Sequence, residues 1–207
     1  MNIHGLECEA VLFDCDGVLV DSEPVSFRAW SEALAVHGYD LDMDVFAASI
    51  GGTEAMVANR FAPDVGVDSV RLELEAQHAF ERIAGEAAAF GDTLAFIDRL
   101  EYAGVPIGVA TNGLRWRLDV LLAAVGLGRL LPFSVTADEV ENPKPAPDLY
   151  LRAASLAGAD AERCVVIEDS PTGVAAAKAA GCLVVAVDRG VFDRRQLAGA
   201  DVVVDRV

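Results

Sequence analysis

Lysine is nearly absent from this chain of 207 residues, which contains only Lys144 and Lys178. Arginine and lysine together number 16 against 33 acidic residues, so the formal net charge is -17. Nucleic acids and anionic membrane surfaces are bound through clustered basic residues, and we therefore expect neither as a partner. A phosphate-binding site in such a chain needs its own local positive charge, from a few side chains or from a metal ion.

Long hydrophobic runs are also missing. The longest apolar stretch, residues 120–128, is about half of the roughly 20 residues that span a bilayer. The N-terminus shows no basic leader followed by an apolar segment, so we expect no signal peptide and a cytoplasmic protein. The four cysteines match no zinc-binding or CxxC spacing, and we expect reduced thiols.

The segments that are present alternate between two patterns. Short runs that are apolar at every position predict central parallel strands over 10–13, 107–110, 165–167, 183–187 and 202–204. Amphipathic segments predict helices over 92–102, 114–125, 147–157 and 171–180, with Asp92 and Thr93 capping the first. This alternation predicts a doubly wound, parallel α/β sheet.

Residues 22–88 interrupt the alternation, because they contain helical patterns and no convincing strand. Helices are expected over 24–36, 42–48, 53–61 and 67–85. We therefore predict an α/β core domain from residues 1–20 and 89–207, with an α-helical domain inserted at 21–88. The insertion holds 13 acidic and 4 basic residues, so it carries more than half of the net negative charge.

Polar residues follow the predicted strands where each strand ends. Asp14 and Asp16 follow the first strand, Thr111 the second and Glu168–Asp169 the third. Ligands of open parallel sheets bind at the carboxyl ends of the strands. Carboxylates that converge there repel one another, so their joint ionisation requires a cation. Oxygen ligands of this kind suit Mg²⁺.

Four segments in chain order resemble the four motifs of the haloacid dehalogenase-like phosphotransferase superfamily. They are residues 14–23, Thr111, Lys144 within 142–148, and residues 168–173. With their flanks they extend from residue 11 to residue 173, and the helical insertion lies where this family has its small cap domain. The resemblance implies a Rossmann-like core with a helical cap.

The resemblance also implies catalytic roles. Asp14 would be the nucleophile that forms an aspartyl-phosphate. Asp16 would be the general acid for the leaving oxygen and then the base for the attacking water. Thr111 and Lys144 would contact the phosphoryl oxygens, the first as a hydrogen-bond donor and the second as a positive charge.

A metal site is implied by the same motifs. Mg²⁺ would be held by Asp14, the backbone carbonyl of Asp16 and Asp169, with Glu168 helping in its inner or outer coordination shell. The remaining candidate residues are substrate-binding ones: Asn112 and Gly113 after the second motif, and Ser49 and Gly52 in the loop 49–54.

Ordinary structural explanations exist for each residue taken alone. An aspartate after a strand is commonly a turn or cap residue, and Thr111 could cap the next helix. A lysine between prolines is commonly a solvated loop residue, and loop 49–54 could be an ordinary turn between helices. Cys15 and Trp30 are expected to pack in the interior. Together these explanations leave unexplained why five ionisable residues follow apolar strands, so we predict an active site.

The residues present and missing at the motifs narrow the possible reactions and substrates. Asp16 argues against dehalogenation, since dehalogenases of this family lack that aspartate. The resemblance extends to β-phosphoglucomutases, which clamp a second phosphate with cap cations and a lysine after the second motif. Here the insertion has no lysine, and Leu114 stands at the latter position. Arg60, Arg115 or Arg117 would have to substitute.

We therefore expect a Mg²⁺-dependent phosphatase acting on a small phosphorylated metabolite, such as a sugar or sugar-acid phosphate, in a monomeric protein. A β-phosphoglucomutase-type mutase is the alternative, and a non-catalytic binding protein on the same fold is a third. The cap is expected to open and close about hinges near residues 20–23 and 88–92.

Overall fold

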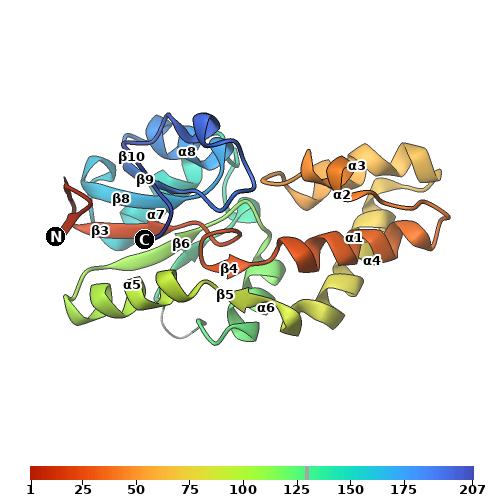
Figure 1. The fold of residues 1–207 in the computed structure, drawn as a ribbon, viewed down its shortest axis with the longest axis horizontal. Coiled ribbons are helices and arrows are strands. Elements are labelled where there is room, and N and C mark those ends of the chain that lie inside the picture. The colour runs from red at the N-terminus through yellow and green to blue at the C-terminus, as the bar shows by residue number, and fades with distance from the viewer. Residues whose placement is uncertain (129–130) are drawn as a thin grey trace.

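The apolar runs form the centre of a parallel sheet. A computed structural model describes residues 1–128 and 131–207. In these residues the large sheet has six strands in the order β10-β9-β8-β3-β6-β7, all parallel (Figure 1). The strands are β3 (Ala10–Phe13), β6 (Ile107–Ala110), β7 (Ser134–Val135), β8 (Cys164–Glu168), β9 (Leu183–Val187) and β10 (Val202–Val204). The predicted doubly wound parallel sheet is therefore confirmed.

Helices cover both faces of this sheet. On one face α5 (Gly91–Tyr102) and α6 (Arg115–Ala124) pack against β3 and β6, through residues that include Phe96, Ile97 and Leu121. On the other face lie α7 (Asp148–Ala157) and α8 (Pro171–Ala179), with Leu149 and Tyr150 in the core (Figure 1). Burial on both faces explains why the central strands are apolar throughout.

The residues predicted to form the insertion build a helical layer of their own. It consists of α1 (Glu23–Ala35), α2 (Met43–Ala47), α3 (Glu54–Val65) and α4 (Ser69–Ile83), beyond the end of the sheet (Figure 1). These helices share a hydrophobic cluster that includes Trp30, Leu34, Phe61 and Leu72. We call this unit the cap. Trp30 is 5% exposed and packs in this cluster, as expected, while it also lines a pocket between cap and core.

Two short strands join the cap to the rest of the chain. β4 (Val20–Asp21) and β5 (Ala88–Ala89) pair in antiparallel fashion, with Val20 opposite Ala89. The sequence shows no strand pattern here, because two residues are too few to display a period. The two segments named as hinges thus form one hydrogen-bonded ribbon, and the exact domain boundary stays a prediction.

Several local expectations are wrong. Helix α5 begins at Gly91 with Phe90 at the cap position, so Asp92 and Thr93 lie inside the helix. Thr93 instead donates to the Val18 carbonyl at 2.8 Å, and Asp92 pairs with Arg189 at 3.0 Å. Both side chains satisfy distant partners that a local pattern does not reveal.

Other elements are longer than expected or were not expected. Helix α3 continues through Pro63 to Val65 and ends at Gly66 in the left-handed region (φ +68°). The hairpin of β1 (Asn2–Ile3) and β2 (Leu6–Glu7), strand β7 and four short 3₁₀ helices are additional. The 3₁₀ helices are Ala84–Glu86, Ala137–Glu139, Ala161–Arg163 and Arg194–Leu197. Among the helices described, none is long and apolar enough to cross a membrane.

Strand register brings the motif residues to one edge of the sheet. Phe13 at the end of β3 lies opposite both Val109 of β6 and Ile167 of β8. The residues that follow these strands therefore leave the sheet at nearly the same level. This places Asp14 and Thr111, which follow β3 and β6, beside Glu168 at the end of β8.

Substitution of Gly108 in β6 can test how tightly the sheet packs against Phe133, which precedes strand β7 at the sheet edge. A Cβ atom at this position would lie 2.0 Å from the ring of Phe133. We expect Gly108→Ala to lower the free energy of unfolding by about 1–3 kcal/mol, because the ring must shift in a filled core. Gly91→Ala is the control, since its Cβ would meet nothing within 4 Å. Equal thermal unfolding midpoints for the two variants would contradict the expectation.

Candidate active site

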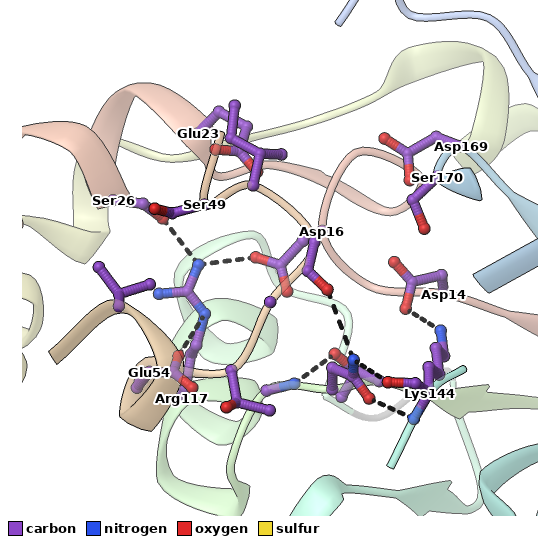
Figure 2. Close-up of a pocket in the computed structure, with 18 of the residues that line it drawn as sticks. Asp14, Asp16, Glu23, Ser26, Ser49, Glu54, Arg117, Lys144, Asp169 and Ser170 are labelled. Atoms are coloured by element: carbon purple, nitrogen blue, oxygen red, sulfur yellow. Dashed lines mark hydrogen bonds and ion pairs between the residues drawn. The ribbon is translucent and has the colours of Figure 1, made fainter. Parts of the chain in front are cut away.

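A pocket lies between the carboxyl edge of the sheet and the cap. It holds about 710 Å³ of empty space, part of it open to solvent. Core and cap side chains both line it (Figure 2). The lining residues include all the predicted site residues except Glu168: Asp14, Asp16, Ser49, Gly52, Thr111, Asn112, Gly113, Lys144 and Asp169. The structure thus brings together residues that lie up to 155 positions apart in the chain.

Lys144 is the buried cation at the base of the pocket. Its Nζ lies 2.6 Å from Asp14 Oδ1 and 2.7 Å from Glu168 Oε1, and its side chain is 3% exposed. Burial alone would lower the pKa of Lys144, but the two carboxylates outweigh burial and raise it above its ordinary value. Lys144 therefore stays charged, and the solvated-loop explanation does not apply to it.

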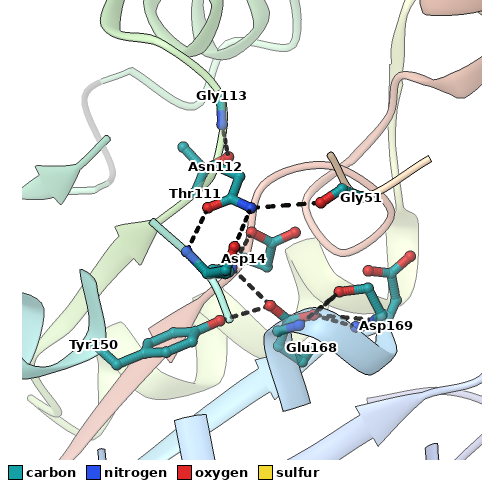
Figure 3. Close-up of polar contacts among 11 residues, drawn as sticks. Asp14, Gly51, Thr111, Asn112, Gly113, Tyr150, Glu168 and Asp169 are labelled. Carbon is teal, nitrogen blue, oxygen red and sulfur yellow. Dashed lines mark hydrogen bonds and ion pairs between the residues drawn. The ribbon is translucent and has the colours of Figure 1, made fainter. Parts of the chain in front are cut away.

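Glu168 holds this lysine and does not line the pocket. Its Oε1 accepts hydrogen bonds from Lys144 and from the Tyr150 hydroxyl, each at 2.7 Å (Figure 3). Its Oε2 accepts from the backbone N–H of Asp169 and from the N–H and hydroxyl of Ser170. Burial would raise the pKa of Glu168, but Lys144 and these donors hold it below its ordinary value. With both oxygens occupied, Glu168 acts here as a support for Lys144.

Asp169 follows Glu168 and points into the pocket (Figure 2). Burial, together with the nearby charges of Glu168 and Asp14, raises its pKa well above the ordinary range. Gly17 (φ +76°) passes so close that a Cβ atom there would lie 1.9 Å from Asp169 Oδ2. The turn after β3 therefore requires glycine, both for its backbone conformation and for this approach.

Asp14 and Asp169 offer a site for a hard cation, with Glu168 close beside them. One oxygen from each lies within 4.8 Å of the other two. Burial raises the pKa of Asp14 to about 7, and Glu168 and Asp16 add to this rise while Lys144 opposes it. A bound metal ion would offset this cost of ionising buried carboxylates, and oxygen donors fit Mg²⁺. The residues present therefore fit the metal that the motifs imply.

The second motif forms a tight turn against the Lys144 loop. Thr111 Oγ1 accepts from the Gly113 N–H at 3.0 Å (Figure 3). Helix α6 begins only at Arg115 with Leu114 at its cap position, so the suggestion that Thr111 caps it is wrong. Asn112 accepts from the Lys144 N–H at 2.9 Å and donates to the Lys144 carbonyl at 3.2 Å. Asn112 thereby fixes the loop that presents the lysine.

Arg117 lines the pocket, although the sequence suggested it only as a substitute cation for a second phosphate. Its Nη2 lies 2.7 Å from Asp16 Oδ1, and its side chain is 10% exposed. Burial alone would raise the pKa of Asp16, but Arg117 and the Ser22 hydroxyl outweigh it and hold that pKa below its ordinary value. The signal in the sequence was an arginine one turn into the helix after the second motif.

The other candidate arginines lie elsewhere. Arg60 donates to Ser49 Oγ at 3.0 Å and supports the cap loop from outside the pocket lining. Arg115 binds Ser134 and Glu139 at 2.7 and 2.8 Å, also outside the lining. Cys15 is 1% exposed in the core, as expected, and all four cysteines are free thiols.

Comparisons with known proteins agree with this geometry. The family profile of haloacid dehalogenase-like hydrolases matches residues 8–181. Hexitol phosphatase A of Escherichia coli is 35% identical over 189 residues, which are 88% of this chain and 84% of that protein. Validoxylamine A 7'-phosphate phosphatase of Streptomyces hygroscopicus is 33% identical over 198 residues, 94% of this chain and 92% of that protein.

A solved structure shares the whole architecture. The phosphate complex of CbbY from Rhodobacter sphaeroides has a TM-score of 0.87 at 26% identity, and the match covers 96% of this chain and 94% of that one. The chain therefore belongs to the haloacid dehalogenase-like hydrolases, and it is an enzyme.

The buried hydrogen bond of Tyr150 provides a test of the support beneath Lys144. Tyr150→Phe removes a donor to Glu168 but preserves the ring. We expect the free energy of unfolding to fall by about 1.5–3 kcal/mol, as for a buried hydrogen bond to a charged group. Tyr102→Phe is the matched control because Tyr102 is 96% exposed. Indistinguishable denaturant midpoints for the two variants would show that the bond adds no stability.

Proposed function

We propose that this enzyme is a Mg²⁺-dependent phosphatase that hydrolyses a small phosphorylated sugar, sugar alcohol or sugar acid. The observation that carries the proposal is the triad of Asp14, Lys144 and Asp169 at the pocket base. It combines a nucleophile, a fixed positive charge and a second carboxylate. The relatives named as hexitol and validoxylamine phosphate phosphatases support the substrate class.

Hydrolysis would proceed in two steps at the pocket base. A carboxylate oxygen of Asp14 attacks phosphorus and the ester P–O bond breaks. Asp16 acts in the fraction of enzyme molecules in which it carries a proton, because its lowered pKa leaves it mostly ionised, and it gives that proton to the leaving oxygen. Asp16, now ionised, takes a proton from a water molecule that attacks phosphorus. The Asp14–phosphate bond breaks, which releases inorganic phosphate and restores Asp14.

Charge neutralisation is the main contribution of the surrounding residues. Lys144, held between Asp14 and Glu168, faces the position of the phosphoryl oxygens, and Thr111 would donate its hydroxyl to one of them. Asp14, Asp169 and the backbone carbonyl of Asp16 would hold Mg²⁺. When bound, this ion would draw the phosphate dianion to the anionic carboxylates and stabilise charge in the transition state.

A phosphomutase is the less well supported alternative. In the described part of the chain, the cations that line the pocket are Lys144 and Arg117, and each is already paired with two carboxylates. A second phosphate would therefore meet Glu23 and Glu54 without a free positive charge. This arrangement favours an uncharged leaving group and hence a phosphatase.

Loss of the nucleophile provides the direct test of the proposal. We expect Asp14→Asn to lower the rate of hydrolysis of 4-nitrophenyl phosphate with Mg²⁺ by roughly 10³-fold or more, because the amide cannot form the phosphoenzyme. Asp64→Asn, which removes an exposed carboxylate on α3, is the control. A wild-type rate in the Asp14→Asn protein would contradict the proposed nucleophile, and release of β-glucose 6-phosphate from primed β-glucose 1-phosphate would favour the mutase.

Metal binding should depend on pH in a defined direction. Without metal, burial raises the pKa of Asp14 to about 7 and raises the pKa of Asp169 well above its ordinary range, so protons compete with a cation for both carboxyls. A cation must displace these protons, so its affinity falls as the pH falls through about 7. The metal-free protein has the opposite trend and gains stability over the same range, because the native state binds more protons than the unfolded state.

We therefore expect Mg²⁺ to raise the thermal unfolding midpoint clearly at pH 8 and little at pH 5.5. At 100 times its dissociation constant, an ion stabilises the native state by about 2.7 kcal/mol. Asp169→Asn should abolish the shift at pH 8. Equal shifts at the two pH values would contradict the assignment of these carboxyls as ligands.

A further inference from the structure

Arg117 joins the core to the cap at the edge of the pocket. It projects from α6, a core helix, into a setting formed largely by cap residues (Figure 2). Its Nη2 donates to Ser26 of α1 at 2.8 Å, and its Nε lies 3.3 Å from Glu54 at the start of α3. Its guanidinium lies 4.2 Å from the ring centre of Phe80 in α4. Three cap helices therefore contact one core side chain.

Only one of the two carboxylate oxygens of Asp16 is hydrogen-bonded to other described residues. Arg117 Nη2 and the Ser22 hydroxyl both donate to the same oxygen, Oδ1. Among the residues that the structure describes, Asp16 Oδ2 receives no hydrogen bond, and Asp16 lines the pocket. The carboxyl group is thus held by one oxygen while the other is left for a ligand.

Glu54 keeps the guanidinium in this position from the cap side. Its Oε1 faces Arg117 Nε, while its Oε2 is a buried oxygen without a hydrogen-bond partner. A fork-shaped guanidinium can bind Asp16, Ser26 and Glu54 at once only when the cap lies against the core. Withdrawal of the cap would separate Arg117 from Ser26, Glu54 and Phe80 together.

A second-phosphate clamp is the other role that such an arginine could serve. This role requires a guanidinium with free donors facing the pocket. Arg117 instead uses Nη2 for Asp16 and Ser26 and directs Nε to Glu54, so two carboxylates already offset its charge, and of its three nitrogens only Nη1 has no hydrogen bond or ion pair in the described part of the chain. Its contacts are those of a residue that orients other protein groups.

We propose that Arg117 is a positioning residue that couples closure of the cap to the orientation of Asp16. With the cap against the core, Arg117 fixes Oδ1 and turns Oδ2 toward the leaving oxygen of the substrate. With the cap withdrawn, Arg117 loses its cap partners and Asp16 loses this fixed orientation. Proton transfer to the leaving group is then restricted to the closed, water-poor pocket. This inference rests on the proposed phosphatase function.

The dependence of the rate on the leaving group tests the proposal. A nitrophenolate is a weak base that departs with little protonation, whereas a sugar alcohol departs only with a proton from an acid. An oriented general acid contributes about 10²–10⁴-fold. We therefore expect Arg117→Gln to reduce kcat/KM for sorbitol 6-phosphate about 10- to 100-fold more than kcat/KM for 4-nitrophenyl phosphate, mainly through kcat.

Two further variants make the measurement specific. Arg115→Gln removes an arginine from the same helix that does not line the pocket, and we expect the ratio of the two kcat/KM values to stay as in wild type. Glu54→Gln leaves Arg117 in place but removes the cap carboxylate, so we expect a change of the ratio in the same direction as for Arg117→Gln and smaller. If Arg117→Gln does not fold, Glu54→Gln still tests the positioning role of Arg117.

The outcomes separate the inference from the proposed function. An equal loss for both substrates in Arg117→Gln and Glu54→Gln, or no loss in either, would overturn the positioning role while phosphatase activity stands. A larger loss for sorbitol 6-phosphate supports it. If the wild-type protein with Mg²⁺ hydrolyses neither phosphate, the proposed function itself is wrong and the inference fails with it.

Discussion

The buried charge of Lys144 is the interaction on which the rest of the site depends. Its ammonium group neutralises Asp14 and Glu168, two carboxylates that could not both ionise in a closed interior without it. Tyr150, Ser170 and the backbone of the Glu168 loop satisfy the other lone pairs of Glu168. The lysine is therefore anchored on one side by Glu168, whose oxygens are both hydrogen-bonded, and directed on the other side toward Asp14, the proposed nucleophile. In a chain of net charge -17, this local positive charge makes a phosphate site physically reasonable.

A second buried cation organises the boundary between the core and the cap. Arg117 contacts Asp16 of the core and residues of three cap helices, so each partner contributes to the position of the others. In the proposed mechanism, Lys144 contacts the phosphoryl group and Arg117 orients Asp16 near the leaving group. The side chains that line the two ends of the pocket differ. Near Lys144 the carboxylates can bind a cation. Near Arg117 the lining includes Glu23 and Glu54, and no unpaired positive charge among the described residues faces a second phosphate there. This asymmetry is what separates a hydrolase site from a mutase site here.

The sheet and the motif residues can be predicted from the sequence because both depend on local composition. Strands such as β3 and β8 are buried on both faces, and a run of apolar residues that ends at aspartate or glutamate is visible without a structure. The expectations that were wrong concern residues whose partners lie far away in the sequence. Asp92 and Thr93 resemble a helix cap, but they bind Arg189 and the Val18 carbonyl. Strands β4 and β5, of two residues each, depend on pairing with one another and carry no period of their own.

The sequence by itself determined the parallel α/β core, the helical insertion and the set of acidic residues with one lysine at the strand ends. Periodicity and the order of the motifs are properties of the chain, so they could be read from it. Only the tertiary structure decided how these groups divide the work. Glu168 became a support for Lys144 because Tyr150 and Ser170 occupy its oxygens. Arg117 became part of the site because α6 points it at Asp16 and at Glu54 of the cap, which lies more than 60 residues earlier in the sequence. Hydrogen-bond geometry and burial assign these roles, and both arise only when distant segments pack together.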